Sequence, residues 1–273
     1  MSQPMPSTKP FVIIPTYNEA QNIEGVTKRI FAAVPNVNVL VIDDSSPDGT
    51  ADVVRELMKD NPSLDLRVRA GKQGLGSAYR FGFREAITLG ATALIEMDAD
   101  LSHEPEALPS LLEASDGGAD LVIGSRYVHG GRSPGLSPSR LALSRAGNVY
   151  ANIALGIGVR DATSGFRVYR PELIEKINLD TVSADGYGFQ IEMVFRSRLL
   201  GATIREVAII FHQRTHGTSK MSNDIVKEAM TLCTVWGFQR RARQLKGLRG
   251  DFVPYHKDAS SIKDAIISAI RTN

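Results

Sequence analysis

Residues 93–100 read Ala-Leu-Ile-Glu-Met-Asp-Ala-Asp, an apolar run that ends in two aspartates one residue apart. We predict that this run is a buried parallel strand, which delivers both carboxylates to its carboxyl end, where open α/β sheets bind their ligands. Side chains alternate along an extended strand, so Asp98 and Asp100 are expected to point to the same side and can share one divalent cation. The alternative is an acidic strand end that only caps the helix after it.

Strand and helix patterns alternate on both sides of this run. Apolar strand patterns cover residues 11–14, 37–42, 64–68 and 119–123, and helical patterns lie between them. In the first helix Ile23, Val26, Ile30 and Val34 form one apolar face, and Asn18 is the expected N-cap. The alternation predicts an α/β fold with right-handed crossovers, in which a doubly wound, mostly parallel sheet has helices on both faces.

Polar residues gather where the predicted strands end. The carboxyl edge of the sheet is expected to carry Glu19, Asp43, Asp44, Asp48, Asp98, Asp100 and Arg126. Folding alone hardly explains polar clusters at every strand end of one edge, so we place the functional site there.

A glycine-rich segment, Gly-Lys-Gln-Gly-Leu-Gly at 71–76, opens the helix that reaches about Leu89. It does not match a P-loop, because Gly76 is not followed by Lys and Ser or Thr. It does not match a dinucleotide fingerprint either, because Tyr79 stands where a small residue is needed. Free amides beside Lys72 can still meet a phosphate or a ribose. A tight strand-to-helix turn is the alternative.

The second half of the chain alternates less regularly. A loop rich in Gly, Ser and Pro covers 130–139, a helix with Arg140 at its start reaches about Leu155, and residues 161–170 contain a turn into a strand. A helix over 188–200, which bears Glu192, and a strand over 204–211 follow. The polar segment 214–220 has a cation at each end. We predict that it is a lid, with an ordinary surface loop as the alternative.

The C-terminal region predicts a long helix over 223–245. Its apolar face is followed by a basic segment that begins at Arg240. This combination suits an anionic lipid surface, whereas core packing of the apolar part with a solvated basic end is an equally supported interpretation. Residues 260–271 have apolar side chains at helical spacing and predict a docking helix.

Composition excludes several classes of protein. The 273 residues carry a net charge of +2, which gives no global preference for nucleic acid. The single cysteine, Cys233, excludes an intrachain disulfide framework and favours a reducing compartment. The first ten residues lack an apolar signal region, and no apolar run approaches the roughly 20 residues of a membrane span. We expect a soluble, cytoplasmic protein.

Six motifs follow one another along the chain: Pro-Thr-Tyr-Asn-Glu at 15–19, Asp-Asp-Ser-Ser-Pro-Asp-Gly-Thr at 43–50, Gly-Leu-Gly at 74–76, Asp-Ala-Asp-Leu-Ser-His at 98–103, Gly-Ser-Arg-Tyr at 124–127 and Gly-Thr-Ser-Lys at 217–220. In this order they resemble the dolichol-phosphate (polyprenol-phosphate) mannosyltransferases of the family-2 GT-A glycosyltransferases. The resemblance covers roughly residues 11–240. Beyond it some family members carry transmembrane helices, whereas this chain has a basic tail.

The resemblance implies a GT-A fold and inverting transfer of mannose from GDP-mannose to a polyprenyl (dolichyl) monophosphate, giving a β-linked product. With the patterns described above, we divide the chain into a flexible N-terminus (1–10), a catalytic domain (11–222), an amphipathic, basic interface helix (223–249) and an extension with a docking helix (250–273). The resemblance also implies that the protein is cytoplasmic and binds peripherally to the cytoplasmic surface of a membrane. In parts of the family a membrane-embedded partner protein recruits the enzyme.

The resemblance also implies roles for individual residues. We add Asp43, Asp48 and Lys72 to the donor-binding residues, because the sequence patterns place them at the carboxyl edge or in the glycine-rich segment. Catalysis falls to Asp98, Asp100 and Arg126, and Mg²⁺ or Mn²⁺ to Asp98, Asp100 and Ser102. Donor binding falls to Pro15, Tyr17, Glu19, Ile42, Asp43, Asp44, Asp48, Lys72, Asp98, Ala99, Asp100, Arg126, Arg214 and Lys220. The acceptor phosphate falls to Arg126, Arg140 and Arg214.

Three other functions are weighed against this one. A sugar nucleotidyltransferase would have a glycine-rich loop after the first strand, where this chain has Pro-Thr-Tyr-Asn-Glu. A sister transferase that uses a UDP-sugar differs only in its donor, so donor assays decide. A non-catalytic polyprenyl-phosphate-binding scaffold would not need to keep both Asp98 and Asp100.

Overall fold

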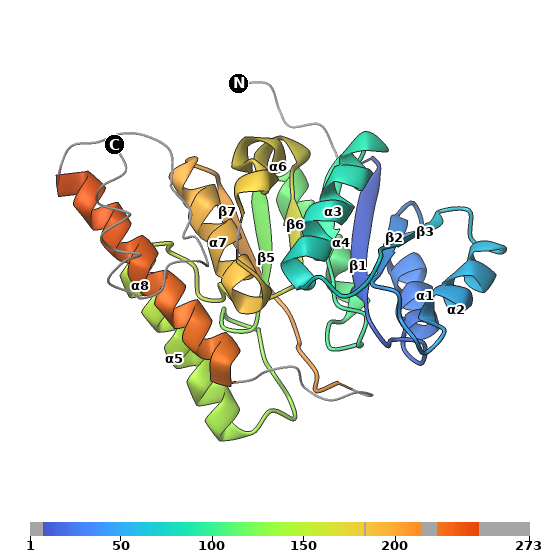
Figure 1. The fold of residues 1–273 in the computed structure, drawn as a ribbon, viewed down its shortest axis with the longest axis horizontal. Helices are drawn as coiled ribbons and strands as arrows, with labels where there is room; N and C mark the ends of the chain where they lie inside the picture. Colours follow the sequence, from blue (N-terminus) through green and yellow to red (C-terminus); the bar gives the residue numbers. More distant parts are fainter. Residues whose placement is uncertain (1–7, 183, 215–222, 246–273) are drawn as a thin grey trace.

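The computed structural model describes residues 8–182, 184–214 and 223–245 (Figure 1). In this part of the chain seven strands form one sheet, in the order β3-β2-β1-β4-β6-β5-β7. The strands are β1 (Pro10–Thr16), β2 (Asn38–Asp43), β3 (Leu64–Val68), β4 (Ala93–Glu96), β5 (Leu121–Ser125), β6 (Arg167–Tyr169) and β7 (Ile204–Ala208). β6 is antiparallel to both of its neighbours, and the other pairs are parallel. The predicted doubly wound, mostly parallel sheet is confirmed.

Helices cover both faces of this sheet. The α-helices are α1 (Ile23–Ala33), α2 (Thr50–Met58), α3 (Leu75–Thr88), α4 (Leu108–Asp116), α5 (Pro138–Leu155), α6 (Pro171–Ile177), α7 (Gly186–Leu199) and α8 (Asn223–Leu245), and two 3-10 helices are η1 (Pro105–Ala107) and η2 (Leu179–Thr181). Side chains alternate along β1, so Val12 and Ile14 enter a core with α1, α2 and α4, whereas Phe11 and Ile13 enter a core with α3, α6 and α7.

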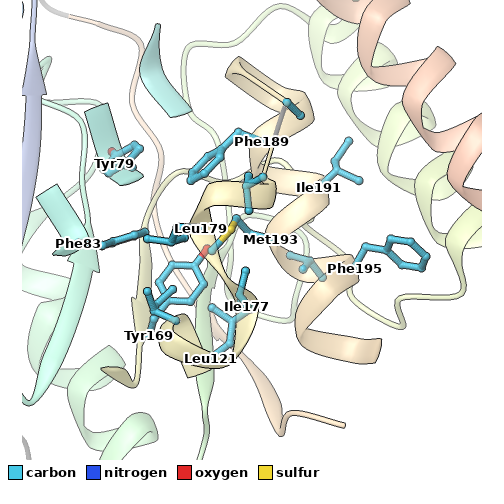
Figure 2. Close-up of a cluster of buried hydrophobic side chains, with 14 of the residues drawn as sticks. Tyr79, Phe83, Leu121, Tyr169, Ile177, Leu179, Phe189, Ile191, Met193 and Phe195 are labelled. Carbon is cyan, nitrogen blue, oxygen red and sulfur yellow. The ribbon is translucent and has the colours of Figure 1, made fainter. Parts of the chain in front are cut away.

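Aromatic side chains join α3 to α7 in the second core (Figure 2). The ring of Tyr79 stacks on those of Phe83 and Phe189, with centroids 6.0 Å apart in both pairs. Phe83 also meets the edge of Tyr169 at 5.5 Å. Such offset and edge contacts add to the burial of large apolar surfaces. The packing fixes the N-terminal ends of α3 and α7 beside the same edge of the sheet.

α5 and α8 pack against each other beside α7, at the far end of the molecule from β3 (Figure 1). Ala229, Cys233 and Trp236 of α8 are buried, so this part of its apolar face belongs to the core, whereas Phe238 is half-exposed. Arg240 donates a hydrogen bond to the carbonyl oxygen of Leu155, so the first cation of the basic segment caps α5. Within the described ranges, no helix combines the length and the apolar character that a membrane crossing requires.

Two local predictions were wrong. α1 begins at Ile23 after the N-cap Asn22, because Asn18 lies in a turn with a φ of 62° and its amide donates to Ser46. β4 ends at Glu96, so both aspartates lie in the irregular segment after the strand rather than on it. α6 was not predicted. Residues 215–222 and 246–273, which include the remainder of the predicted lid and the predicted docking helix, lie outside the described residues.

Candidate donor and metal site

A cavity of about 390 Å³ lies at the carboxyl edge of the sheet. It is lined by Pro15, Thr16, Tyr17, Glu19, Asp44, Lys72, Gly74, Leu75, Ala78, Asp98, Ala99, Asp100, Thr163, Gly165, Asp185, Gly186, Tyr187, Gln190 and Arg214. The carboxyl ends of β1, β2 and β4 are brought together here by the parallel register, in which Thr16 pairs with Asp43 and Ile13 with Glu96. Nine of the predicted site residues therefore share one cavity, which we call the edge cavity.

The wall of the edge cavity carries more acids than bases. Five carboxylates line it, those of Glu19, Asp44, Asp98, Asp100 and Asp185, against the cations Lys72 and Arg214. Anions confined in a partly buried site repel one another, and an added cation relieves this repulsion. The wall therefore favours a cation more than a bare anion.

Asp98 and Asp100 both reach the edge cavity, so the prediction that they face one space agrees with the geometry. The Oδ2 atom of Asp98 lies 3.6 Å from Nε2 of the buried His103. Asp100 is nearly buried; its Oδ1 accepts from the amide of Ser102 at 3.0 Å, and its Oδ2 lies 2.5 Å from Nε of Arg214. These contacts hold the two carboxylates in place.

The two aspartates fit a divalent cation only if the donor completes its ligands. Among the described residues, no group of three or more His, Cys, Asp or Glu side chains is placed to hold a metal ion. Mg²⁺ is commonly bound through one or two carboxylates together with substrate phosphates and water. Hard oxygen donors at Asp98 and Asp100 match that requirement.

Tyr17, Lys72 and Asp44 form the side of the edge cavity near β1 and β2. The ammonium group of Lys72 lies 4.8 Å from the centroid of the Tyr17 ring, a cation–π contact. Asp44 receives two hydrogen bonds from Arg69, at 2.6 and 2.8 Å, and both side chains are buried. The amide of Gln73 also donates to Asp44, at 3.3 Å. These contacts orient Asp44 and tie the glycine-rich segment to β2.

Asp185, just before α7, holds the start of α3. Its Oδ1 accepts from the amide of Gly76 at 2.6 Å. The carboxylate also occupies the space beside Gly74, where an added Cβ would lie 1.9 Å from Oδ2, and Gly74 has a φ of +94°. Both facts require glycine at position 74. The turn interpretation of the glycine-rich segment is thus supported, and Lys72 and Gly74 still line the edge cavity.

Four predicted donor or metal residues are not part of the cavity wall. Asp43 is fully buried, and its carboxylate accepts from Thr16 and Ser46. Asp48 is exposed and accepts from the Thr50 hydroxyl and from the amides of Ala20 and Thr50; burial raises the pKa of its carboxyl, but these hydrogen bonds lower it more, so the net shift is downward. Their hydrogen bonds hold the turns on which lining residues lie. Ile42 and Ser102 are also fully buried and away from the wall, so direct contact of all four with a donor or metal stays a prediction.

Arg126 is bound to a carboxylate that sequence reasoning did not single out. Its Nε and Nη2 atoms donate to Asp161 at 2.7 Å each, and Nη2 also donates to Thr163. Burial lowers the pKa of Arg126, but the hydrogen bonds and charge of Asp161 raise it more, so the net shift is upward. Arg126 is not among the residues that line the edge cavity. Its contact with donor or acceptor phosphate stays a prediction.

A smaller, mostly apolar cavity of about 80 Å³ adjoins the edge cavity, and Thr163 and Tyr187 line both. We call it the side cavity. It is lined by Arg126, Leu143, Ser144, Gly147, Tyr150, Thr163, Tyr187, Ile191, Ala229, Met230 and Cys233, from α5, α7, α8 and the loops beside them. Burial raises the pKa of the Cys233 thiol to about 12, as expected for a packed, unreactive cysteine.

Arg140 is exposed in the first turn of α5 and lines neither cavity, and Lys220 lies outside the described residues. Their predicted roles are not tested by the geometry. Of the predicted lid, the described residue Arg214 contacts Asp100.

Arg167, on β6, holds backbone segments that contribute residues to the edge cavity. It is fully buried and donates to the carbonyl oxygens of Ala162, Ser164 and Gln190. These bonds fix the loop that carries Thr163. Glu96, opposite Arg167 in the β4–β6 register, is also buried; burial raises its pKa to about 7, although the charge of Arg167 lowers it.

Apart from Arg214, sequence reasoning missed the contribution of the second half of the chain to the wall. The missed lining residues include Thr163, Gly165, Asp185, Tyr187 and Gln190. A signal existed for the first two, because Thr-Ser-Gly-Phe-Arg at 163–167 has the composition of a turn. No comparable signal marks Gln190, which is one polar position within a helix.

The antiparallel β6 inserted into an otherwise parallel sheet, with an acidic cavity at the carboxyl edge, is the arrangement of a GT-A glycosyltransferase. The fold is similar to that of the mannosyltransferase PcManGT from Pyrobaculum calidifontis, solved in complex with GDP-Man and Mn²⁺, with a TM-score of 0.55, 18% identity and coverage of 97% of this chain and 69% of that chain. It is also similar to glucosyl-3-phosphoglycerate synthase from Mycobacterium tuberculosis, solved with Mn²⁺, UDP and glucosyl-3-phosphoglycerate, with a TM-score of 0.59, 21% identity and coverage of 86% and 80%. These likenesses confirm the predicted GT-A fold.

The chain belongs to glycosyl transferase family 2, whose sequence pattern matches residues 11–178. It is 44% identical over 244 residues to the polyprenol monophosphomannose synthase of Mycolicibacterium smegmatis, covering 89% of this chain and 92% of the relative. It is 47% identical over 238 residues to the undecaprenyl-phosphate mannosyltransferase of Micrococcus luteus, covering 87% and 98%. The predicted membership of the glycosyltransferases, and the resemblance to polyprenol-phosphate mannosyltransferases, are confirmed.

Proposed function

We propose that this chain transfers mannose from GDP-mannose to a polyprenyl monophosphate and releases GDP. The excess of carboxylates on the wall of the edge cavity carries the proposal. A nucleoside diphosphate is itself an anion, so five carboxylates and two cations would repel it unless a divalent cation entered as well. The two relatives, named for mannose transfer to polyprenyl phosphates, support the choice of sugar and acceptor.

Asp98 and Asp100 would hold the divalent cation, Mg²⁺ or Mn²⁺, and Tyr17, Lys72 and Asp44 would bind the nucleoside. When bound, the cation neutralises the diphosphate as the bond to the sugar breaks. Arg214 is adjacent to Asp100, so its guanidinium is placed to meet the diphosphate once the carboxylate has another partner. PcManGT, solved with GDP-Man and Mn²⁺, supports this choice of donor and ion.

The acceptor oxygen would attack the anomeric carbon directly. A phosphate monoester has a second pKa of about 6, so it is largely a dianion at neutral pH and needs no general base. The new bond joins this oxygen to the anomeric carbon, the bond to the diphosphate breaks, and no proton moves. A single displacement inverts the anomeric carbon and gives a β-linked product.

The buried Glu192 is a poor candidate for a base. Its Oε1 accepts from Arg196 at 2.8 Å and its Oε2 from the amide of Ala184 at 3.0 Å, which gives it a structural role next to Asp185. His103 is buried behind Asp98, and His216 lies outside the described residues. This arrangement favours an acceptor that is already ionised.

The acceptor lipid would enter from the α5–α8 side of the molecule. The side cavity joins the edge cavity there, and the exposed apolar residues of α5 are Leu143, Val149 and Ile153, with Met230 and Phe238 on α8. Exposed Arg140 and Arg145 lie on the same helix α5. Apolar side chains beside cations suit the surface of an anionic bilayer, and we propose that this face binds at the cytoplasmic surface of a membrane.

Transfer of label from radiolabelled GDP-mannose into the organic phase, with Mg²⁺ and a short polyprenyl phosphate, tests the function. We expect transfer by the full chain, loss of transfer in Asp100→Ala, and unchanged transfer in Asp52→Ala, a matched loss of an exposed carboxylate on α2. Transfer from a UDP-sugar instead of GDP-mannose would move the chain to a sister activity. An α-linked product would contradict direct displacement, and lipid-phosphate binding without transfer from any donor would favour the scaffold.

A further inference from the structure

A second large cavity, of about 530 Å³, lies behind the edge cavity. It is lined by Val68, Arg69, Gln73, Ser77, Arg80, Phe81, Arg84, Leu179, Asp180 and Val182, from the end of β3, α3 and η2. Arg69 and Gln73 separate the two cavities, because both also bind Asp44 on the edge-cavity side. We call it the arginine cavity.

Three guanidinium groups line the arginine cavity, and they differ in their partners. Arg69 is paired with buried Asp44, and Arg84 lies 2.5 Å from Asp180 in an exposed pair. Arg80 is half-buried and makes no hydrogen bond or ion pair with any residue in the described part of the chain. Burial lowers the pKa of Arg80, the charges of Asp185 and Glu192 raise it, and the charges of Arg84 and Arg69 lower it again, so the net shift is downward. A partly desolvated guanidinium group without a hydrogen-bond acceptor favours the binding of an anion.

The remaining wall of the arginine cavity combines apolar surface with hydrogen-bonding groups. Phe81, Leu179 and Val182 supply apolar surface, and Ser77 supplies a hydroxyl group that already accepts from Arg69 at 2.8 Å. Pockets for small molecules have volumes of about 300–1,000 Å³ and combine apolar walls with a few polar groups. The arginine cavity has both properties.

The position of the arginine cavity favours a soluble ligand. Its walls come from α3 and the edge strand β3, and β3 lies at the opposite end of the molecule from α5 and α8, whose exposed apolar side chains form the proposed membrane face (Figure 1). A ligand that reaches the cavity would therefore come from solution.

We propose that the arginine cavity binds a small, soluble phosphate monoester, with Arg80 as the principal contact of the phosphate and the apolar wall against the organic part. The planar guanidinium group matches two phosphate oxygens at once. Arg69 and Arg84 already have carboxylate partners, so the phosphate would pair chiefly with Arg80. The proposed ligand lies outside the edge cavity, although Asp185 on the wall of that cavity acts on the charge of Arg80.

Calorimetric titration of the full chain with phenyl phosphate, without nucleotide or metal, tests this site. Phenyl phosphate carries both a phosphate and an apolar ring. We expect binding with a dissociation constant in the millimolar range or tighter, and a loss of about tenfold or more in Arg80→Ala, as for a charge-assisted hydrogen bond. Arg80→Lys keeps the positive charge but cannot donate to two phosphate oxygens in one plane, so it should bind with intermediate strength.

Lys72→Ala is the matched control, because Lys72 is a cation of the edge cavity. It should bind phenyl phosphate as the unchanged chain does. Loss of binding in Lys72→Ala with binding retained in Arg80→Ala would place the anion in the edge cavity and overturn the proposal. So would no binding by the unchanged chain at about 10 mM ligand. Displacement of phenyl phosphate by phosphatidic acid vesicles would assign the site to a lipid headgroup instead of a soluble monoester.

Thermal unfolding of the Arg80 variants separates a lost contact from a lost fold. Arg80 makes no described hydrogen bond, so its removal should leave the midpoint of unfolding unchanged or slightly raised. The test uses neither donor nor acceptor, and a failure of mannose transfer would leave its outcome unaffected.

Discussion

Replacing Arg69 by methionine should destabilise the protein strongly, because it leaves the carboxylate of Asp44 without its partner. The side chains of Arg69 and Asp44 are 6% and 7% exposed, and two hydrogen bonds of 2.6 and 2.8 Å join them. Removing one member of a buried pair costs about 3–5 kcal/mol. Asp44 keeps the amide of Gln73 and faces the edge cavity, where water can reach it, so we expect about 3 kcal/mol.

Urea unfolding of four proteins measures this effect. The set is the unchanged chain, Arg69→Met, Asp44→Asn and the double variant. In the double variant no unpaired charge remains, so it should be more stable than the sum of the single effects predicts, with an interaction energy of about 1–3 kcal/mol.

Arg67→Met is the matched control, on β3 two residues before Arg69. Arg67 pairs with Asp65 and Glu85, but its side chain and theirs are about one-third exposed. Such pairs contribute about 0–1 kcal/mol, so this variant should change stability little. Equal losses in Arg67→Met and Arg69→Met, or strictly additive effects in the Asp44 and Arg69 variants, would refute the reasoning.

Three further predictions follow from other parts of the structure. Burial raises the pKa of Glu96 to about 7 from its usual 4.5, so its contribution to stability is fully present below about pH 4.5 and is lost as the pH rises through about 7. In the unchanged chain the free energy of unfolding should fall by roughly 3 kcal/mol between these pH values, and this fall should be absent in Glu96→Gln. The same pH profile in both proteins would contradict the prediction. Gly74→Ala forces a Cβ against Asp185 at a positive φ, so it should lower the unfolding free energy by about 1–3 kcal/mol in urea, and a neutral effect would show that Asp185 moves aside. Ile153→Glu should weaken sedimentation with anionic vesicles several-fold, whereas the equally apolar, half-exposed Leu199 of α7 should tolerate glutamate, and equal effects would place the membrane face elsewhere.

The order of strands and helices could be predicted because it depends on local patterns. Residues 11–14 and 37–42 are apolar runs between turn signals, and both lie within strands of the structure. The long C-terminal helix was predicted over 223–245 and is found there. Helix starts were less predictable, because Asn18 can cap a helix but instead donates its amide to Ser46, 28 residues away.

The roles of individual carboxylates could not be predicted to the same extent. Asp43 and Asp44 are neighbours in sequence, yet the first is buried among hydroxyl groups from β1 and its own turn, and the second faces the edge cavity. The sequence does not indicate which of the two carboxylates faces the cavity. Their orientation depends on Thr16, 27 residues from Asp43, and on Arg69, 25 residues from Asp44. Arg126 shows the same effect, since its partner Asp161 is 35 residues distant.

The ion pair between Asp100 and Arg214 at the edge cavity leads us to expect that donor and metal bind together. Asp100 is nearly buried and its described cationic partner is Arg214, so a divalent ion that arrives alone would displace Arg214 from its carboxylate. A diphosphate that arrives alone would draw Arg214 away and leave Asp100 without a cation beside a new anion. If both arrived, the proposed ion would pair with Asp100 and the diphosphate with Arg214, so that Asp100 would keep a cationic partner. The binding free energies of ion and donor should therefore favour each other reciprocally.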